Sequence, residues 1–241
     1  MKDSIVIIPT YNEKENIEKM IRYVMNLEHD FHILIIDDGS PDGTGQIVTN
    51  MLDEFKDRLF IEHRSGKLGL GTAYIHGFKW SLKHNYQYIY EMDADFSHNP
   101  DDLIRLRQKC VDGADLAIGS RYISGINVIN WPLGRVLMSY GASMYVRLIT
   151  RMPIMDATAG FKCYKKEVLE KIPFDKIRMK GYGFQIELKF TSWKYGFNVQ
   201  EVPIIFTDRQ EGTSKMSGGI FGEAFFGVMK MKFRSFFRKY K

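Results

Sequence analysis

The chain has 241 residues, of which 44% are hydrophobic and 26% are charged. These fractions are ordinary for a folded protein and exclude a disordered tail, a collagen-like repeat and a disulfide-stapled miniprotein. The length corresponds to one large domain or two small ones. The net charge of +5 suits an anionic partner, such as a nucleotide, a phospholipid surface or a nucleic acid, without choosing among them.

The two cysteines and the start of the chain bear on where the protein works. Cys110 and Cys163 cannot form a disulfide framework, and we expect both to be reduced thiols. Residues 1–4 contain no basic region followed by a small-residue cleavage site, so we expect no signal peptide. No stretch approaches the ~20 consecutive apolar residues of a membrane span.

Short apolar runs alternate with segments of helical spacing in the first half of the chain. The runs predict strands buried on both faces at residues 4–9, 32–36, 59–63, 86–92 and 116–118. Helical spacing covers residues 14–27, 43–55, 71–83 and 100–111. The repeated strand–helix–strand order predicts a parallel sheet with helices on both faces.

The second half is less regular. We expect helices at residues 133–150 and 184–195 and strands at residues 161–164 and 198–206. No linker separates the halves, so both are placed on one core.

The C-terminal segment predicts a basic amphipathic helix. One face carries Phe221, Phe225, Val228, Met229, Phe233 and Phe236, and the opposite face carries Lys230, Arg234, Arg238 and Lys241. Such a helix can lie in a membrane interface, or pack on the domain or on a partner subunit. The pattern leaves these open.

Polar clusters follow the predicted strands at the positions where parallel α/β sheets bind ligands. Asp93 and Asp95 end the fourth strand, one residue apart, and two such carboxylates can hold Mg²⁺ or Mn²⁺ while leaving positions for a diphosphate. Basic residues also recur in loops: Arg121, Arg135, Arg209 and Lys215. Arginine forks match phosphate oxygens, so these residues suggest a pocket for two phosphorylated ligands.

Several other site types are excluded by spacing. An EF-hand register starting at Asp38 would need a glutamate where Thr49 stands. The glycines of residues 66–71 lack a Walker ending, no Gly-x-Gly-x-x-Gly follows the first strand, and we expect these glycines to allow a tight loop near a ligand. The six histidines show no metal-ligand spacing, and we expect no histidine base near the motifs.

The motifs, taken in order, resemble glycosyltransferase family 2, and within it the dolichol/polyprenol-phosphate mannosyltransferases. The matching segments are PTYNE at 9–13, DDGSPDGT at 37–44, MDADFSH at 92–98, GSRY at 119–122, EVP at 201–203, and Arg209 with GTSK at 212–215. The resemblance covers about residues 4–216.

The resemblance implies a GT-A fold of the α/β class, a Rossmann-like, mostly parallel sheet with helices on both faces. It implies an inverting transfer of a mannosyl group from GDP-mannose to a dolichyl or polyprenyl phosphate. Residues 1–125 would form the nucleotide-sugar half and residues 126–216 the acceptor half, with residues 217–241 as the basic helix.

The resemblance also assigns roles to residues. Pro9, Tyr11, Glu13 and Asp38 would hold the nucleoside, and Asp93, Ala94 and Asp95 the diphosphate and metal. Arg209 and Lys215 would grip the donor phosphates. Arg121 and Arg135 would orient the acceptor phosphate, and Gln185 lies in a segment that faces the sugar and acceptor region.

Two features depart from some relatives. First, this chain has Ser97 where some relatives carry a metal-binding glutamine, and the serine side chain has a shorter reach. Second, this chain lacks the C-terminal transmembrane helices that some relatives have. We therefore expect a cytoplasmic protein on the membrane surface, attached by the basic helix, by a partner subunit or by the lipid itself. We also expect that it can form a homo-oligomer and that it has no nucleic acid partner.

Two alternatives remain. One is a family 2 transferase that uses UDP-glucose or UDP-N-acetylglucosamine, with a lipid-phosphate or sugar-hydroxyl acceptor. A hydroxyl acceptor requires a catalytic carboxylate, for which Glu187 is the candidate. The other is a non-catalytic module that binds anionic surfaces, which the acidic strand-end loops oppose.

Overall fold

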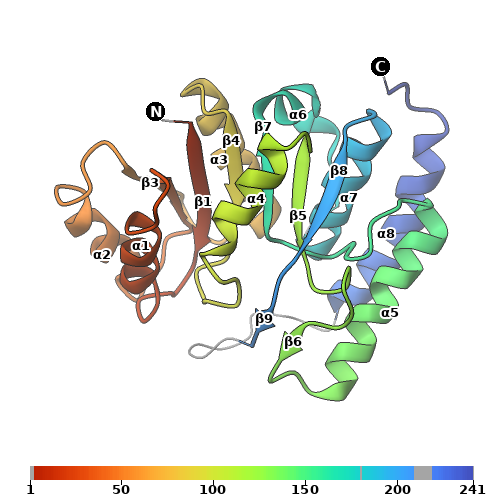
Figure 1. Ribbon diagram of the computed structural model, residues 1–241, viewed down its shortest axis with the longest axis horizontal. Helices are drawn as coiled ribbons and strands as arrows, with labels where there is room; N and C mark the ends of the chain where they lie inside the picture. Colours follow the sequence, from red (N-terminus) through yellow and green to blue (C-terminus); the bar gives the residue numbers. More distant parts are fainter. Residues whose placement is uncertain (1–2, 180, 209–218, 241) are drawn as a thin grey trace.

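The computed structural model describes residues 3–179, 181–208 and 219–240. In the described part, a seven-stranded sheet has the order β3-β2-β1-β4-β7-β5-β8 (Figure 1). The strands of this sheet are β1 (Ser4–Thr10), β2 (His32–Asp37), β3 (Leu59–His63), β4 (Tyr88–Glu91), β5 (Leu116–Ser120), β7 (Lys162–Lys165) and β8 (Val199–Pro203). All neighbours run parallel except β7, which is antiparallel to both β4 and β5. The predicted mostly parallel sheet is confirmed.

Helices cover both faces of the sheet, because alternate residues of the central strands face opposite ways. Val6 and Ile8 of β1 pack with one set of helices, and Ile5 and Ile7 with the other. The first set is α1 (Ile17–Met25), α2 (Thr44–Met51) and α4 (Asp102–Val111). The second set is α3 (Leu70–Lys83), α5 (Leu133–Thr150), α6 (Lys166–Lys171), α7 (Gly181–Lys194) and α8 (Gly219–Ser235).

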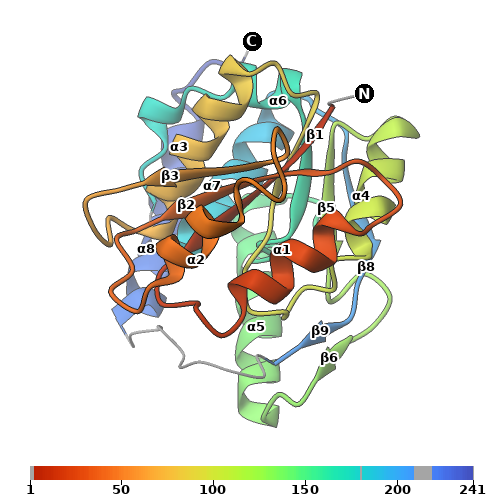
Figure 2. The same ribbon diagram turned by 90° about the vertical axis from the view of Figure 1, so that its left-hand side faces the viewer.

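A second, short sheet pairs β6 (Val128–Ile129) with β9 (Phe206–Thr207) in parallel. Figure 2 shows it apart from the main sheet, near α5. The predicted single strand at residues 198–206 is therefore wrong. The main-sheet part ends at Pro203, paired with the last residue of β5, and the chain then crosses to pair with Val128.

Other predictions about elements need smaller corrections. The strand β3 lies at the edge of the sheet and is half-buried, so it is not covered on both faces as predicted. The helix α6, the 3₁₀ turn Phe174–Lys176 and β6 were not expected from the sequence. Cys110 and Cys163 are buried free thiols whose Sγ atoms lie 3.6 Å apart.

The buried residues of the C-terminal helix differ from the apolar face that the sequence predicted. Val228 and Met231 of α8 are buried, whereas Phe225, Met229, Phe233 and Phe236 are exposed. Phe221 and Lys241 were also assigned to faces, but the side chain of Phe221 and the residue Lys241 lie outside the described part of the chain. The helix therefore packs on the domain and still presents apolar side chains to solvent, because its apolar residues exceed one face.

The helix α8 lies along α5. The Tyr145 hydroxyl donates to the Phe225 carbonyl at 2.9 Å, and the two rings stack with centroids 4.5 Å apart. Among the described residues, no helix is both long and apolar enough to cross a membrane.

Candidate active site

A cavity of about 1000 Å³ lies at the carboxyl ends of the strands, where the sequence placed the ligand loops. It collects residues from β1, the loops after β2, β4 and β5, and helices α5 and α7. The predicted site residues that line it are Pro9, Tyr11, Glu13, Asp38, Asp93, Ala94, Asp95, Ser97, Arg121, Arg135 and Gln185. Arg209 and Lys215 lie outside the described residues.

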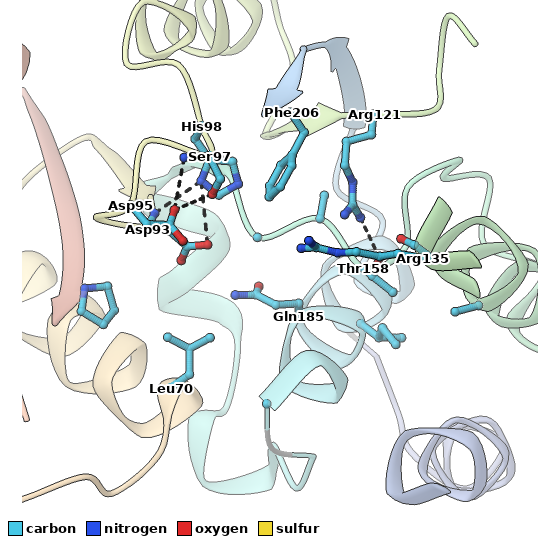
Figure 3. A pocket seen from close by; sticks show the side chains of 18 of the residues that line it. Leu70, Asp93, Asp95, Ser97, His98, Arg121, Arg135, Thr158, Gln185 and Phe206 are labelled. Carbon is cyan, nitrogen blue, oxygen red and sulfur yellow. Dashed lines mark hydrogen bonds and ion pairs between the residues drawn. The ribbon is translucent and has the colours of Figure 1, made fainter. Parts of the chain in front are cut away.

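The charged groups are separated across the cavity. Figure 3 shows the carboxylates of Asp93 and Asp95 on one side and the guanidinium groups of Arg121 and Arg135 on the other, with Gln185 between them. A cationic site and an acidic site thus face each other across the space a reacting ligand would occupy.

The acidic side is held in shape by its own turn. Asp95 accepts hydrogen bonds from the Ser97 backbone N–H at 3.1 Å and from the Ser97 hydroxyl at 2.5 Å. Phe96 between them has a positive φ of 57°, which the tight turn requires. Ser97 therefore orients Asp95, a role that the sequence did not predict.

The acidic side fits a divalent cation with incomplete protein coordination. The Asp93 side chain is 42% exposed and Asp95 lines the same cavity. Among the described residues, no three acidic, histidine or cysteine side chains converge into a closed metal cage. Mg²⁺ keeps several waters and is usually bound through one or two carboxylates together with substrate phosphates, so the donor set fits such an ion.

The end of the cavity near β2 contains an ion pair that the sequence did not reveal. Arg64 donates from Nε and Nη2 to the two oxygens of Asp38, at 2.6 and 2.8 Å, and both side chains are nearly buried. Asp38 lines the cavity as predicted, but its carboxylate is already bound to a cation. Lys67, from the glycine-rich loop, lies 5.1 Å from the ring centroid of Tyr11.

The glycine-rich loop also has a packing role. A Cβ on Gly71 would lie 2.8 Å from the ring of Phe184 in α7. This glycine therefore lets α3 approach α7 closely, which differs from the predicted approach of backbone to ligand. Gly69, with φ of +100°, supplies the tight loop.

On the cationic side, Arg121 is fixed by a buried carboxylate. Its Nε and Nη2 donate to Asp156 at 2.7 Å each, and Nη2 also donates to the Thr158 hydroxyl at 2.8 Å. Burial raises the pKa of the Asp156 carboxyl, but the Arg121 charge outweighs burial and holds that pKa below its usual value. The guanidinium is thus ionised, oriented and partly neutralised at the cavity wall.

Arg135 is held more loosely. Its Nη1 donates to Asp208 at 2.8 Å, with 35% of its side chain exposed, and its guanidinium lies 4.0 Å from the ring centroid of Trp131. Trp131 also lies 5.5 Å from the Arg121 guanidinium. One aromatic ring therefore packs against both cations, as in cation–π pairs elsewhere.

Gln185 is oriented by a buried ion pair beneath the cavity. Glu91 of β4 and Lys162 of β7 are register partners, with Nζ and Oε1 3.0 Å apart and both side chains fully buried. Gln185 Nε2 donates to Glu91 at 2.6 Å, and its Oε1 accepts from Lys162. The buried pair therefore holds the amide at both ends, and Figure 3 shows its nitrogen end directed into the space between the two charged sides.

His98, the last residue of the acidic motif, lies in the cavity, although the sequence offered no histidine there as a base. It lines the cavity, stacks on Phe161 at 4.8 Å and faces Asp93, whose backbone N–H donates to its Nδ1 at 3.4 Å. Burial lowers the pKa of His98 to about 4, so the ring is neutral at physiological pH. The sequence placed His98 in this motif but gave it no role.

Glu187, the carboxylate considered for a hydroxyl acceptor, does not line the cavity. Its Oε2 accepts from the backbone N–H groups of Arg178 and Met179, at 2.8 Å each. It is 6% exposed and caps the segment before α7, which is a structural role.

The cavity continues from the arginines into an apolar end between α5 and α8. This part is lined by Met138, Ala142, Tyr145, Val146, Phe225 and Val228. A ligand that has both a phosphate and an apolar tail would match the order of polar and apolar walls.

The model of the family described as glycosyl transferase family 2 matches residues 5–173. The chain is 47% identical over 231 residues to the polyprenol monophosphomannose synthase of Mycolicibacterium smegmatis, covering 96% of this chain and 87% of that protein. It is 42% identical over 226 residues to the undecaprenyl-phosphate mannosyltransferase of Micrococcus luteus, covering 94% of this chain and 92% of that protein.

Solved structures share the fold at low sequence identity. Glucosyl-3-phosphoglycerate synthase from Mycobacterium tuberculosis, solved with Mn²⁺, UDP and phosphoglyceric acid, aligns with a TM-score of 0.72 and 15% identity, covering 96% of this chain and 78% of that one. A mannosyltransferase from Pyrobaculum calidifontis, solved with GDP-mannose and Mn²⁺, aligns with a TM-score of 0.56 and 16% identity, covering 96% and 73%.

Proposed function

The chain belongs to glycosyl transferase family 2 and is a glycosyltransferase, and we propose that it moves a mannosyl group from GDP-mannose to a polyprenyl phosphate. The observation that carries this proposal is the order of the cavity walls. An acidic rim, two arginines and an apolar end follow one another, which suits a sugar diphosphate beside a lipid phosphate.

The donor would lie on the acidic side. Pro9, Tyr11, Glu13 and Asp38 would hold the nucleoside, with Arg64 fixing the Asp38 carboxylate. Asp93 and Asp95 would bind Mg²⁺ or Mn²⁺, with Ala94 beside them and Ser97 orienting Asp95. That ion, when bound, would offset charge on the departing diphosphate. Arg209 and Lys215 are proposed for the donor phosphates from the family resemblance alone.

The acceptor phosphate would lie between Arg121 and Arg135. Its second pKa is near 6, so at neutral pH it is largely a dianion and needs no general base. One of its oxygens would form the bond to the anomeric carbon as the bond from that carbon to the diphosphate breaks, releasing GDP with inversion. Arg121 and Arg135 would position the nucleophile, and the Gln185 N–H₂ would face the sugar between them.

A hydroxyl acceptor is less well supported. It would require a carboxylate base, and the predicted one, Glu187, is committed to two backbone N–H groups away from the cavity.

The acceptor lipid also suggests where the protein works. An exposed apolar surface, here called the α5–α8 apolar surface, consists of Leu133, Leu137, Met144 and Leu148 on α5 with Phe226, Met229, Phe233, Phe236 and Phe237 on and after α8. Lys230 and Arg234 flank it on α8, and both are exposed. Such a surface suits the interface of a bilayer, which would place the protein peripherally on a membrane with the apolar end of the cavity beside the lipid.

A donor panel tests this function. Purified protein is incubated with Mn²⁺ or Mg²⁺, a polyprenyl phosphate and labelled GDP-mannose, UDP-glucose or UDP-N-acetylglucosamine, and label is followed into organic solvent. We expect transfer from GDP-mannose only. Label that reaches the organic phase from a UDP-sugar, but not from GDP-mannose, would overturn the proposed donor.

A further inference from the structure

A second cavity, of about 470 Å³, lies at the C-terminal end of α8. Four of the residues that line it are cationic: Lys176, Arg234, Arg238 and Lys239. We call it the basic pocket. It shares no lining residue with the active-site cavity, and the nearest lining residues of the two on α8, Val228 and Phe233, are five positions apart, or about 7.5 Å along the helix.

Positive charge in the basic pocket is not compensated within the described part of the chain. None of its four cations forms an ion pair with a described carboxylate. The Nη2 atom of Arg238 is buried without a hydrogen-bond partner. Nearby, burial, together with repulsion from Lys194 and Arg151, lowers the pKa of Lys232. A bound anion would satisfy these groups.

The remaining wall of the pocket is aromatic and joins the α5–α8 apolar surface. Phe233 and Phe237 line the pocket and are 65% and 77% exposed, and Tyr195 also lines it. The cations therefore lie at the edge of an apolar surface. This arrangement matches a ligand whose phosphate is attached to apolar chains, and it matches a fully hydrated anion less well.

We propose that the basic pocket binds the phosphate of an anionic phospholipid headgroup in the bilayer on which the α5–α8 apolar surface rests. This inference rests on the proposed membrane placement. The headgroup would fix the C-terminal end of α8. The first half of α8 borders the acceptor end of the active-site cavity.

Vesicle co-sedimentation of the full chain tests the proposal. The pocket variant is Arg234→Gln/Arg238→Gln. The matched control is Lys230→Gln/Arg151→Gln. It removes the same number of positive charges, one on α8 and one at the end of α5, but changes no residue of the pocket. Vesicles contain phosphatidylcholine alone or with phosphatidylglycerol. Diffuse attraction accounts for about fivefold in affinity per cation. We expect the pocket variant to lose at least a further tenfold on phosphatidylglycerol vesicles compared with the control.

Equal losses in the two variants would overturn the proposal, since the cations would then act only as surface charge. Inorganic phosphate separates the two sources of the anion. We expect millimolar phosphate to leave vesicles bound. Full displacement, with a rise in the melting temperature of the wild type but not of the pocket variant, would show a site for free phosphate instead.

Mannosyl transfer to detergent-solubilised polyprenyl phosphate serves as the independent readout. Both variants should retain it, because neither changes a residue of the active-site cavity. If the wild type binds anionic vesicles through the pocket but transfers nothing, the proposed function fails and the pocket stands. If transfer proceeds and the variants bind vesicles alike, only the pocket fails.

Discussion

Asp156 and Arg121 form a buried bidentate ion pair, with two N–H···O bonds of 2.7 Å. The carboxylate is completely buried, and the Arg121 guanidinium borders the cavity. Asp156 therefore fixes the Arg121 guanidinium, and in the proposed mechanism it would be a positioning residue that acts on the acceptor phosphate through Arg121.

The variant Asp156→Asn tests this relationship. An amide can accept only one of the two bonds, so Arg121 should move from its position and retain an unbalanced charge. We expect kcat/KM for polyprenyl phosphate to fall by about a hundredfold, mainly through KM for the acceptor. KM for the nucleotide sugar should change little. Equal effects on both substrates would indicate a merely structural role for Asp156.

The buried Lys189 predicts a pH dependence of stability. Its Nζ donates to the Ala159 carbonyl at 2.6 Å. Burial, and after it repulsion from Lys162 and Arg121, hold the pKa of Lys189 well below the usual value. Attraction from Asp156 and Glu91 acts in the opposite direction but is weaker. Between the folded and unfolded pKa values, the unfolded chain binds a proton that the folded chain does not, so Lys189 makes stability rise with pH.

Urea unfolding of the wild type and Lys189→Met, at several pH values between about 7 and 9.5, isolates this contribution. Buried tyrosines and cysteines titrate in both proteins and cancel in the difference. We expect the stability of the wild type relative to the variant to increase with pH. The exposed Lys79→Met serves as control and should keep the wild-type slope. A difference that stays flat, or falls, contradicts the prediction.

Gly71 predicts a packing effect with a close control. It is the second residue of α3, and a Cβ there would meet the Phe184 ring at 2.8 Å. Gly134 is the second residue of α5, and a Cβ there would meet nothing within 4 Å. We expect Gly71→Ala to destabilise by about 1–3 kcal/mol. Gly134→Ala should change stability by less than about 1 kcal/mol, in the stabilising direction. Thermal unfolding compares the two, and similar melting temperatures would refute the close approach.

The elements with strong local patterns could be predicted from the sequence. Ile17, Met20, Ile21 and Val24 form the apolar stripe expected for α1, and all are buried. The strand-end rule correctly places Asp93, Asp95 and Arg121 around one cavity at the carboxyl ends of the strands.

Contacts between distant segments could not be predicted in this way. The strand β7 inserts antiparallel between β4 and β5, although its residues follow β5 by about 40 positions. Only this pairing brings Lys162 against Glu91, and Gln185 onto both. Arg64 and Asp156 were missed for the same reason, because a lone charged residue has no local signal for its partner.

The most direct test of the account compares Asp95→Asn with Asp101→Asn at saturating Mn²⁺. Asp101 is an exposed carboxylate just before α4 that contacts Tyr23 and does not line the cavity. Transfer of label from GDP-mannose to polyprenyl phosphate is measured in organic solvent. We predict a loss of at least about a hundredfold for Asp95→Asn, since it removes an ionised ligand of the cation, and wild-type transfer for Asp101→Asn. Transfer by Asp95→Asn within about threefold of wild type would contradict the account. Losing only ~1.4 kcal/mol of transition-state stabilisation would already slow transfer about tenfold.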